Sequence, residues 1–221
     1  MYSVIKKLAR RKRDEWHTSR AELLLSLLTP LPGARVLDVG GNDGEFMARV
    51  RARADLHVTI ADVGDTELEL ARRRGFETVK LSEDQPLPFP DGAFDLVIAN
   101  SVIEHVTSGA ATAPDWRSAA FERQRLFANE LRRVGRSYFV QTPHRRFPIE
   151  AHTWLPFVGW LSHEAAARVV AVSDRFWVKY CGGVDWNLLA DEEMRELFPE
   201  ALLLTETVVG LPKSLIAYHR G

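Results

Sequence analysis

The 221-residue sequence predicts an α/β fold, built as a mostly parallel sheet with helices on both faces. Three observations support this prediction. Short apolar segments alternate with amphipathic helical segments along most of the chain, a glycine-rich turn joins the first such strand to a helix, and 46% of the residues are hydrophobic, which is enough for a full core. Strands that alternate with helices form βαβ units, in which consecutive strands are parallel.

The first expected element is a helix over residues 1–28, because Trp16, Leu23 and Leu27 recur at near-helical spacing. It ends at "TPLPG" (29–33), since the two prolines cannot continue a helix. The apolar pattern then predicts strands at 35–39, 57–62, 77–81, 94–100 and 137–143, with helices at 44–53, 65–74 and 114–134. A further helix near 191–197 and strands at 201–207 and 214–220 complete a seven-stranded sheet.

One long segment interrupts this alternation. Residues 143–190 are rich in aromatic residues, proline and histidine, as in "TPHRRFPIEAHTWLPFVGWLSHE". We therefore expect a cap inserted after the fifth strand, where it would contact the substrate. With no repeat or low-complexity tract in the chain, residues 1–221 are expected to form a single domain that begins with the basic helix over 1–28.

The turn in "VLDVGGNDGEF" (36–46) predicts a ligand site. Its glycines can take positive φ or allow close approach to the backbone, and the following helix presents free N–H groups. Asp62 ends the second strand, 22 residues after Gly40, where an acid can accept both hydroxyls of a ribose. A plain tight turn and a helix-capping acid remain the alternatives. Asp38 would repel a pyrophosphate but suits a cationic group, and Asn42 replaces the middle glycine of G-x-G-x-x-G, which disfavours a nicotinamide-dependent oxidoreductase.

These residues carry a resemblance to a known family. "VLDVGGNDG" resembles motif I of the class I S-adenosylmethionine-dependent methyltransferases, written D-x-G-x-G-x-G, and "LSEDQPLPFPDGAFDLVIANSVIEHV" (81–106) is similar to later motifs of their type-11, UbiE/Coq5-like group. The C-terminal "GLPKSLIAYHR" also looks like that group. The resemblance implies a Rossmann-like class I methyltransferase fold and S-adenosyl-L-methionine as the cofactor.

The resemblance also implies roles for individual residues. Asp38 and the glycines would shape the pocket for the methionine part, Asp62 would hold the ribose, Glu83 would contact the adenine, and Asn100 with Ser101 would line the methionine tail. The expected cofactor-binding residues are Asp38, Gly40, Gly41, Asn42, Gly44, Asp62, Val63, Glu83, Asp84, Asn100 and Ser101. Two of these depart from the family pattern, because Asn42 replaces a glycine and Glu83 is longer than the usual aspartate.

Methyl transfer from a sulfonium needs an acceptor held in line with the methyl carbon, and a hydroxyl acceptor also gains from a general base. The expected candidates for catalysis are His105, His144, Glu150 and His152. Each has a structural alternative. His105, with its neighbour Glu104, can simply orient the loop after the fourth strand. His144 can lie in a solvated turn, and Glu150 and His152 can satisfy each other.

A metal is expected to be absent. Some methyltransferases bind a divalent cation through E-x-x-E-H and a later histidine, and Glu104 and His105 match the end of that motif. Ser101, however, stands at the position of the first glutamate, and only His144 or His152 offers a substitute.

The cap stretch "TPHRRFPIEAHTWLPF" resembles a form of these enzymes found in bacterial glycan and natural-product pathways. We therefore expect an S-adenosylmethionine-dependent methyltransferase (EC 2.1.1.-) that acts on a hydroxyl oxygen of a small molecule or glycan. The cap aromatics Phe147, Trp154, Phe157 and Trp160 would stack on such an acceptor or form the core of the cap. A catalytically inactive cofactor-binding partner and an RNA methyltransferase are the alternatives, although no strong basic patch accompanies the core.

Charge and cysteine content say less. The net charge of −1 does not indicate nucleic acid as a partner, and the single cysteine, Cys181, excludes an internal disulfide and is expected to be an ordinary small side chain. The basic stretch "KKLARRKR" (6–13) is either a solvated helix face or a peripheral contact with an anionic membrane surface. Without a span of about 20 apolar residues or a signal peptide, the expected location is cytoplasmic. The sequence does not define the oligomeric state.

Overall fold

The computed structural model describes residues 2–83, 85–110, 113–177 and 181–221, with side chains from residue 15 onward. Asp84 and the side chains of the basic stretch 6–13 lie outside the described part, so the predictions made for them stay predictions.

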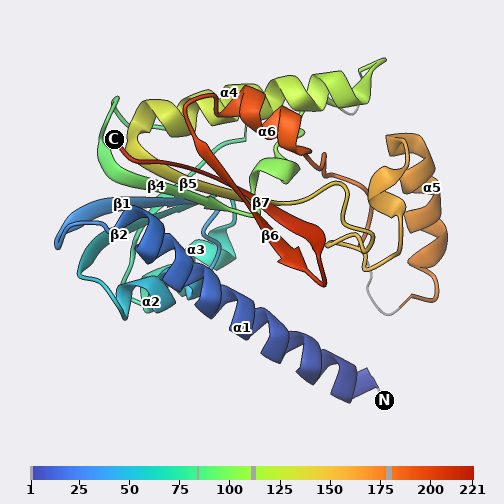
Figure 1. Cartoon of the computed structure of the whole chain (residues 1–221), viewed down its shortest axis with the longest axis horizontal. Coiled ribbons are helices and arrows are strands. Elements are labelled where there is room, and N and C mark those ends of the chain that lie inside the picture. Colours follow the sequence, from blue (N-terminus) through green and yellow to red (C-terminus); the bar gives the residue numbers. More distant parts are fainter. Residues whose placement is uncertain (1, 84, 111–112, 178–180) are drawn as a thin grey trace. The chain divides into compact units, whose positions relative to one another are not determined.

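The strands form one seven-stranded sheet in the order β3-β2-β1-β4-β5-β7-β6 (Figure 1). β1 pairs in parallel with β2 on one side and with β4 on the other, and β2 pairs in parallel with β3. β6 and β7 form an antiparallel hairpin. The α/β prediction and the predicted number of strands are confirmed, and the strand order is that of the class I methyltransferase fold.

The chain divides into two compact units, which are described separately. Unit 1 comprises Met1–Ala99, Leu131–Phe139 and His219–Gly221, and unit 2 comprises Asn100–Glu130 and Val140–Tyr218. Because the division falls within elements, helix α4 (Trp116–Val134) and strand β5 (Gly135–Pro143) each contribute residues to both units.

Unit 1 holds the first half of the sheet and the helices that follow its strands. Its elements are α1 (Tyr2–Leu28), β1 (Ala34–Val39), α2 (Glu45–Arg51), β2 (Leu56–Asp62), α3 (Asp65–Arg73), β3 (Glu77–Lys80) and β4 (Phe94–Asn100), whose last residue belongs to unit 2. β1 is flanked on both sides and nearly all its side chains are buried, which explains its run of apolar residues. Its register pairs Asp38 with Ile60 and Ile98, which places this acid near the carboxyl end of the strand.

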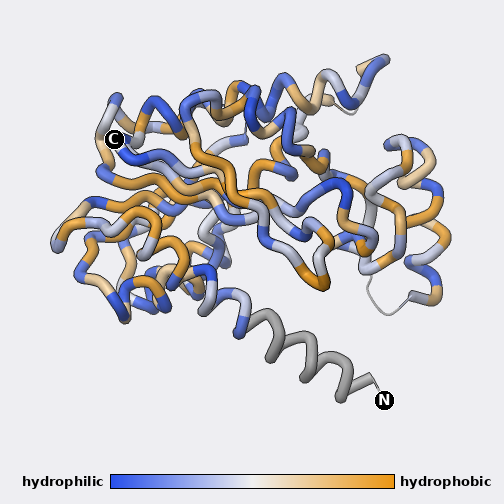
Figure 2. Tube along the Cα trace, in the orientation of Figure 1, coloured by the Kyte–Doolittle hydropathy of each residue, from blue (hydrophilic) through white to orange (hydrophobic). Residues whose placement is uncertain are grey.

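Unit 2 holds the hairpin, the predicted cap and the helices around them. Its elements are the 3-10 helix η1 (Ile103–His105), most of α4, the end of β5, the 3-10 helix η3 (Val158–Trp160), α5 (His163–Ser173), α6 (Asp191–Leu197), β6 (Leu202–Val208) and β7 (Leu211–His219). Residues 144–190 follow β5 and precede α6, as the prediction of an insertion after the fifth strand requires. Figure 2 shows the apolar tip of the β6–β7 hairpin, where Val209 is 96% exposed.

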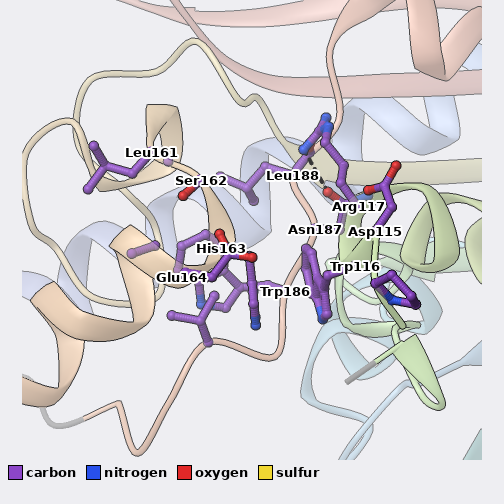
Figure 3. Close-up of a pocket in the computed structure, with 14 residues that line it drawn as sticks. Asp115, Trp116, Arg117, Leu161, Ser162, His163, Glu164, Trp186, Asn187 and Leu188 are labelled. Atoms are coloured by element: carbon purple, nitrogen blue, oxygen red, sulfur yellow. Dashed lines mark hydrogen bonds between the residues drawn. The ribbon is translucent and has the colours of Figure 1, made fainter. Parts of the chain in front are cut away.

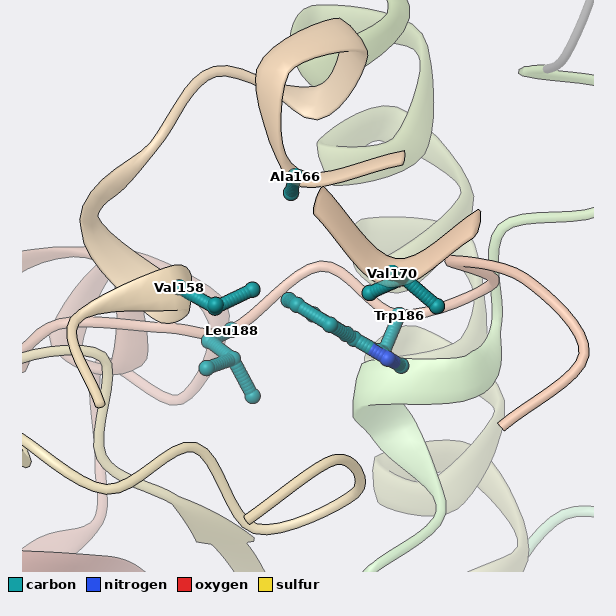
Figure 4. Packing of buried hydrophobic residues seen from close by; sticks show 5 residues of the cluster. All are labelled: Val158, Ala166, Val170, Trp186 and Leu188. Atoms are coloured by element: carbon teal, nitrogen blue, oxygen red, sulfur yellow. The ribbon is translucent and has the colours of Figure 1, made fainter. Parts of the chain in front are cut away.

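The insertion has a small core of its own. Val158 from η3, Ala166 and Val170 from α5, and Trp186 and Leu188 from the returning chain pack together (Figure 4). Helix α5 itself was not expected from the sequence. It begins at Ser162, whose hydroxyl accepts a hydrogen bond from the Ala165 N–H, so that a side-chain cap starts the helix.

The cap aromatics do not form that core. Phe157 and Trp160 are more than half exposed and lie against each other, with ring centroids 4.8 Å apart. Trp154 is 38% exposed. The alternative in which these three rings form the core of the cap is therefore wrong. Among the described residues, no helix is both long enough and apolar enough to cross a bilayer.

Candidate cofactor site and catalytic cluster

The glycine turn of unit 1 has a backbone that most residues could not adopt. Gly40, Asn42 and Gly44 all have positive φ, at 69°, 54° and 74°, and asparagine is among the few side chains that tolerate this region. Gly41 needs no unusual φ but has no room for a side chain, since an added Cβ would lie 2.5 Å from Oδ2 of Asp38. The turn therefore brings bare backbone close to a buried carboxylate.

Asp38 is almost fully buried beside this turn. Its Oδ1 atom has no hydrogen-bond partner among the residues that the structure describes. Burial, and then the charge of Asp62, raise the pKa of Asp38 from 3.8 to about 8. A buried carboxylate with an unused acceptor is costly unless a cation or donor meets it, so the site suits a ligand with a cationic end, as the sequence predicts.

Asp62 ends β2 on the other side of the turn. Its Oδ2 accepts a hydrogen bond from the Asn42 N–H at 2.8 Å, and its Oδ1 accepts one from the Gly64 N–H at 2.9 Å. A carboxylate can accept about four hydrogen bonds, so each oxygen keeps a lone pair for a ribose hydroxyl. The two readings of Asp62, as a turn acid and as a ribose ligand, are thus compatible.

The other expected cofactor residues lie at or near strand ends. Val63 follows β2 and is 46% exposed, and Glu83 is exposed on the loop after β3. Asn100 is half-buried at the end of β4. Ser101 has a φ of 58°, and both its N–H and its hydroxyl donate to Gln141. The chain at the end of β4 is therefore held in one unusual conformation.

Unit 2 places Glu104 in η1, directly after this bend. The side chain is completely buried, and its Oε2 accepts a hydrogen bond from the Thr142 hydroxyl at 3.0 Å. Oε1 has no hydrogen-bond partner among the described residues. Burial raises the pKa of Glu104 above its usual value, although the nearby His105 and His152 oppose the shift.

Each of the two neighbouring histidines is oriented by a carboxylate. His105 Nδ1 lies 3.2 Å from Oδ2 of Asp185, and His152 Nδ1 lies 2.6 Å from Oε1 of Glu150. Burial lowers the pKa of His105, but Asp185 and Glu104 raise it more, so the net shift is upward. With Nδ1 engaged, Nε2 is the nitrogen of each ring left to meet a ligand.

Glu150 is fixed by its own turn. Besides His152 Nδ1, its carboxylate accepts hydrogen bonds from the His152 N–H, the Thr153 N–H and the Thr153 hydroxyl. Burial alone would raise the pKa of Glu150, but these hydrogen bonds and the charge of His152 lower it below its usual value. The two residues do satisfy each other, as one reading of the sequence held, and in doing so they set the direction of the imidazole.

Three of the groups converge. The rings of His105 and His152 meet edge to face with centroids 4.6 Å apart, and His152 Nε2 lies 4.0 Å from Glu104 Oε1. One ligand atom each from Glu104, His105 and His152 all lie within 4.8 Å of one another. We call these three residues the Glu–His–His cluster. It can act on a proton or, with a small contraction, hold a metal ion.

The sequence reasoning missed the residues that support this cluster. Gln124 from α4 donates to the carbonyls of Ile103 and Asn187, and Asn187 donates its amide to Gln124 and its N–H to the carbonyl of Glu104. Thr107 donates to the carbonyl of Asp185. Asp185 and Asn187 flank Trp186 in the sequence and stand in no recognisable motif, so no sequence signal points to them.

His144 is not part of the cluster. It is buried, its Nδ1 accepts a hydrogen bond from the Arg146 N–H, and its Nε2 lies 3.0 Å from Oδ2 of Asp191. Both ring nitrogens are therefore used within the protein, and the alternative of a solvated turn is wrong. Cys181 packs against the apolar core of the insertion, and burial raises the pKa of its thiol, which fits an ordinary side chain.

A pocket of about 260 Å³ lies in unit 2 beside the cluster's supporting residues (Figure 3). Trp116 and His163 stack at its wall with centroids 3.8 Å apart. Trp186 also lines the pocket, and its ring stacks on His152 with an interplanar angle of 14°. Arg117 lines it as well and donates to Asn187. The pocket is thus aromatic with polar groups at its edge, and one of its walls touches the cluster.

Comparisons with known proteins agree on a family. A family model described as a methyltransferase domain matches residues 37–137. The chain is 30% identical over 165 residues to a ubiquinone biosynthesis O-methyltransferase of Xylella fastidiosa, and the match covers 63% of each protein. It is 30% identical over 180 residues to the protein of that name in Paramagnetospirillum magneticum, covering 75% of this chain and 68% of the relative.

Solved structures give the same result at the level of the fold. A S-adenosylmethionine-dependent methyltransferase from Aquifex aeolicus superposes with a TM-score of 0.57 at 17% identity, covering 99% of this chain and 97% of the other.

Proposed function

The chain belongs to the class I S-adenosylmethionine-dependent methyltransferases, and from this premise we propose that it methylates a hydroxyl oxygen of a small molecule or glycan. The proposal that the acceptor atom is oxygen rests on one observation: the imidazoles of His105 and His152 are each oriented by a carboxylate and lie next to the buried Glu104. A hydroxyl must lose its proton as it is methylated, whereas a neutral amine can attack without a base. The O-methyltransferase names of the two relatives support the same choice.

The cofactor half of the proposal rests on unit 1. The S-adenosylmethionine molecule has an α-ammonium group and a sulfonium as its cationic groups, and a ribose diol. Asp38, with its unused buried oxygen, suits a cationic group, and Asp62, with a free lone pair on each oxygen, suits the diol. The bare backbone at Gly41 lets a ligand approach closely.

The reaction is a single displacement. The acceptor oxygen forms a bond to the methyl carbon as the bond from that carbon to sulfur breaks, and S-adenosylhomocysteine leaves. The hydroxyl proton passes to the Glu–His–His cluster, where His152 offers Nε2 and Glu150 holds the opposite side of the ring. His144 is left out of the proposal because both its nitrogens are engaged.

The acceptor is proposed to be a ring of modest size. The pocket of about 260 Å³ includes the indoles of Trp116 and Trp186 and the His163 ring in its lining, and this largely apolar wall suits an aromatic or sugar ring. Residues 143–190, which supply part of the lining, keep their proposed role as a substrate cap within a single methyltransferase domain.

A labelled-methyl screen tests this proposal. The purified chain is incubated with methyl-labelled S-adenosylmethionine and paired acceptors that differ only in carrying a hydroxyl or an amine on the same phenyl or sugar ring. Label is expected on the hydroxyl members. Transfer to amines alone would contradict the proposal, and tight S-adenosylhomocysteine binding without transfer to any acceptor would favour the inactive binding module.

A further inference from the structure

We propose that Glu104, His105 and His152 bind a divalent transition-metal ion through Oε1 of the glutamate and Nε2 of each histidine. Two imidazoles and one carboxylate form a ligand set that suits such ions and leaves coordination positions open. The sequence alone favours no metal, because Ser101 replaces an acid at the motif's first position. The structure supplies His152 from the segment after β5 instead.

The spacing of the ligand atoms is close to what an ion requires. One ligand atom from each of the three residues lies within 4.8 Å of the others, and Glu104 Oε1 and His152 Nε2 are 4.0 Å apart. Ligands bonded at roughly 2.0–2.2 Å to one ion lie no more than about 4.4 Å apart. The side chain of His105 is 37% exposed, so it has room for the small rotation that closes the set.

Glu104 gives an independent indication of a missing partner. Its side chain is fully buried, Oε2 is satisfied by Thr142, and Oε1 has no hydrogen-bond partner in the described part of the chain. Buried carboxylates are normally paired with a charge, hydrogen-bonded or coordinated to a metal. The unused oxygen lies on the side of the two imidazoles, where an ion would meet it.

The histidines carry the second feature of a metal site. Metal-bound histidines generally have their other ring nitrogen hydrogen-bonded to a carboxylate or carbonyl, which fixes the tautomer and the ring orientation. Here Asp185 engages Nδ1 of His105 and Glu150 engages Nδ1 of His152. An accidental contact between two histidines and an acid does not require either of these partners.

The site is also rigid. Gln124 and Asn187 fix the backbone of η1 around Glu104, and the hydrogen bonds within the turn 150–153 fix Glu150. Ligands held in place by packing and hydrogen bonds lose little freedom when an ion binds. The use of the ion rests on the proposed function. In the metal-loaded chain Nε2 of His152 would be a ligand and not the base, and an ion with open positions would promote loss of the hydroxyl proton by binding the acceptor hydroxyl and lowering its pKa. Binding of the ion itself does not depend on that function.

The test measures binding of metal ions alone, without cofactor or acceptor. The full chain is stripped with a chelator and titrated with Zn²⁺, Mn²⁺ and Co²⁺ by calorimetry, and Co²⁺ loading is followed by its visible absorption. We expect one ion per chain. His152→Ala and Glu104→Gln should abolish saturable binding, and Asp185→Asn should weaken it about 10- to 100-fold. His57→Ala, at an exposed histidine of β2, is the matched control and should bind like the wild type.

Two further measurements, circular dichroism of each variant and a methyl-transfer assay with and without metal, separate loss of metal binding from misfolding and from failure of the proposed function. Circular dichroism shows whether each variant folds, and if Glu104→Gln does not, the half-exposed His105→Ala takes its place. Wild-type chain that binds no ion, or His105→Ala and His152→Ala chains that bind as well as the wild type, would overturn the inference. If methyl transfer to a hydroxyl occurs equally well in the metal-free and metal-loaded chains, the proposed function stands and the ion has no part in the transfer, while the binding titration alone decides whether the site exists. If the ion binds but no acceptor is methylated, the site stands and the proposed function fails.

Discussion

Asp38 in unit 1 and Glu104 in unit 2 are buried carboxylates that differ in their neighbours. Asp38 lies near the end of β1 and Glu104 just after the end of β4, and each has one oxygen without a hydrogen-bond partner in the described residues. Asp38 faces a turn of bare backbone and a second acid, Asp62. Glu104 faces two imidazoles. The same chemical group is thereby suited to a cationic ligand in one unit, and to a proton or metal ion in the other.

The two carboxylates also differ in how far apart in the sequence the residues around them lie. The site around Asp38 is built from one short stretch and the end of the next strand, with backbone groups in the main role. The cluster around Glu104 joins side chains from η1, the turn 150–153 and the segment 185–187. Substitutions should therefore separate cofactor affinity from turnover.

The largest effect is expected for His152→Ala. Loss of this imidazole removes the proposed acceptor of the hydroxyl proton, so kcat should fall about 10²- to 10⁴-fold. The affinity for S-adenosylhomocysteine should stay unchanged, because the cofactor groups are elsewhere in the chain. Steady-state kinetics and calorimetry check both expectations, with His57→Ala as the control. Full activity of His152→Ala would show that His152 has no part in methyl transfer, and the proposed contrast between a cofactor site around Asp38 and a catalytic cluster around Glu104 would be wrong.

The next effect is expected for Asp62→Ala. This change removes the two proposed hydrogen bonds to the ribose and also releases the Asn42 and Gly64 N–H groups. Hydrogen bonds to charged groups contribute about 1.5–3 kcal/mol each, so the Kd for S-adenosylhomocysteine should rise at least about tenfold. Asp65→Ala, at a highly exposed acid of the following helix that pairs with Lys80, is the matched control. Equal affinity in the two variants would show that the ribose is bound elsewhere.

A pH-dependent effect on stability is expected from Asp38. Its pKa is raised from 3.8 to about 8 in the folded chain, so between these values the folded state holds a proton that the unfolded state has released. The contribution of Asp38 to the free energy of unfolding therefore falls as pH rises through this window and is constant above it. Asp38→Asn cannot ionise, and its stability relative to the wild type should increase from about pH 5 to about pH 8. Urea unfolding at several pH values measures this difference, and parallel curves would mean that Asp38 is ionised in the folded protein.

The smallest effect is expected for Ser162→Ala. The change removes the side-chain cap of α5 and should lower the free energy of unfolding by about 1 kcal/mol. Cofactor affinity should not change. A loss of S-adenosylhomocysteine binding in this variant would show that the insertion influences the glycine turn, and the contrast between the two units would have to be redrawn.

The strands, most helices and the glycine turn could be predicted from the sequence because their determinants are local. Alternating apolar segments define β1 to β7, and three glycines, an asparagine and two acids define the turn. Helix α5 is not predicted because "HEAAARVVAVS" follows a stretch dominated by aromatics and prolines, where the change in pattern indicates only an inserted cap.

The candidate cluster could be predicted only in part. His105, Glu150 and His152 were recognised as chemically able residues, but nothing in the sequence places Asp185 beside His105 or leaves one oxygen of Glu104 without a partner. These facts depend on contacts between segments far apart in the chain. For the same reason His144 looked equivalent to the other histidines until its two buried hydrogen bonds were seen.

The turn 150–153 orients His152 without help from the exposed aromatic residues that follow it in the chain. Because Glu150 accepts its hydrogen bonds from the second and third residues after it, His152 and Thr153, the His152 ring is oriented within a four-residue segment. The exposed rings of Phe157 and Trp160 lie outside that segment. Substitutions at those two positions should therefore leave the orientation of the His152 ring unchanged.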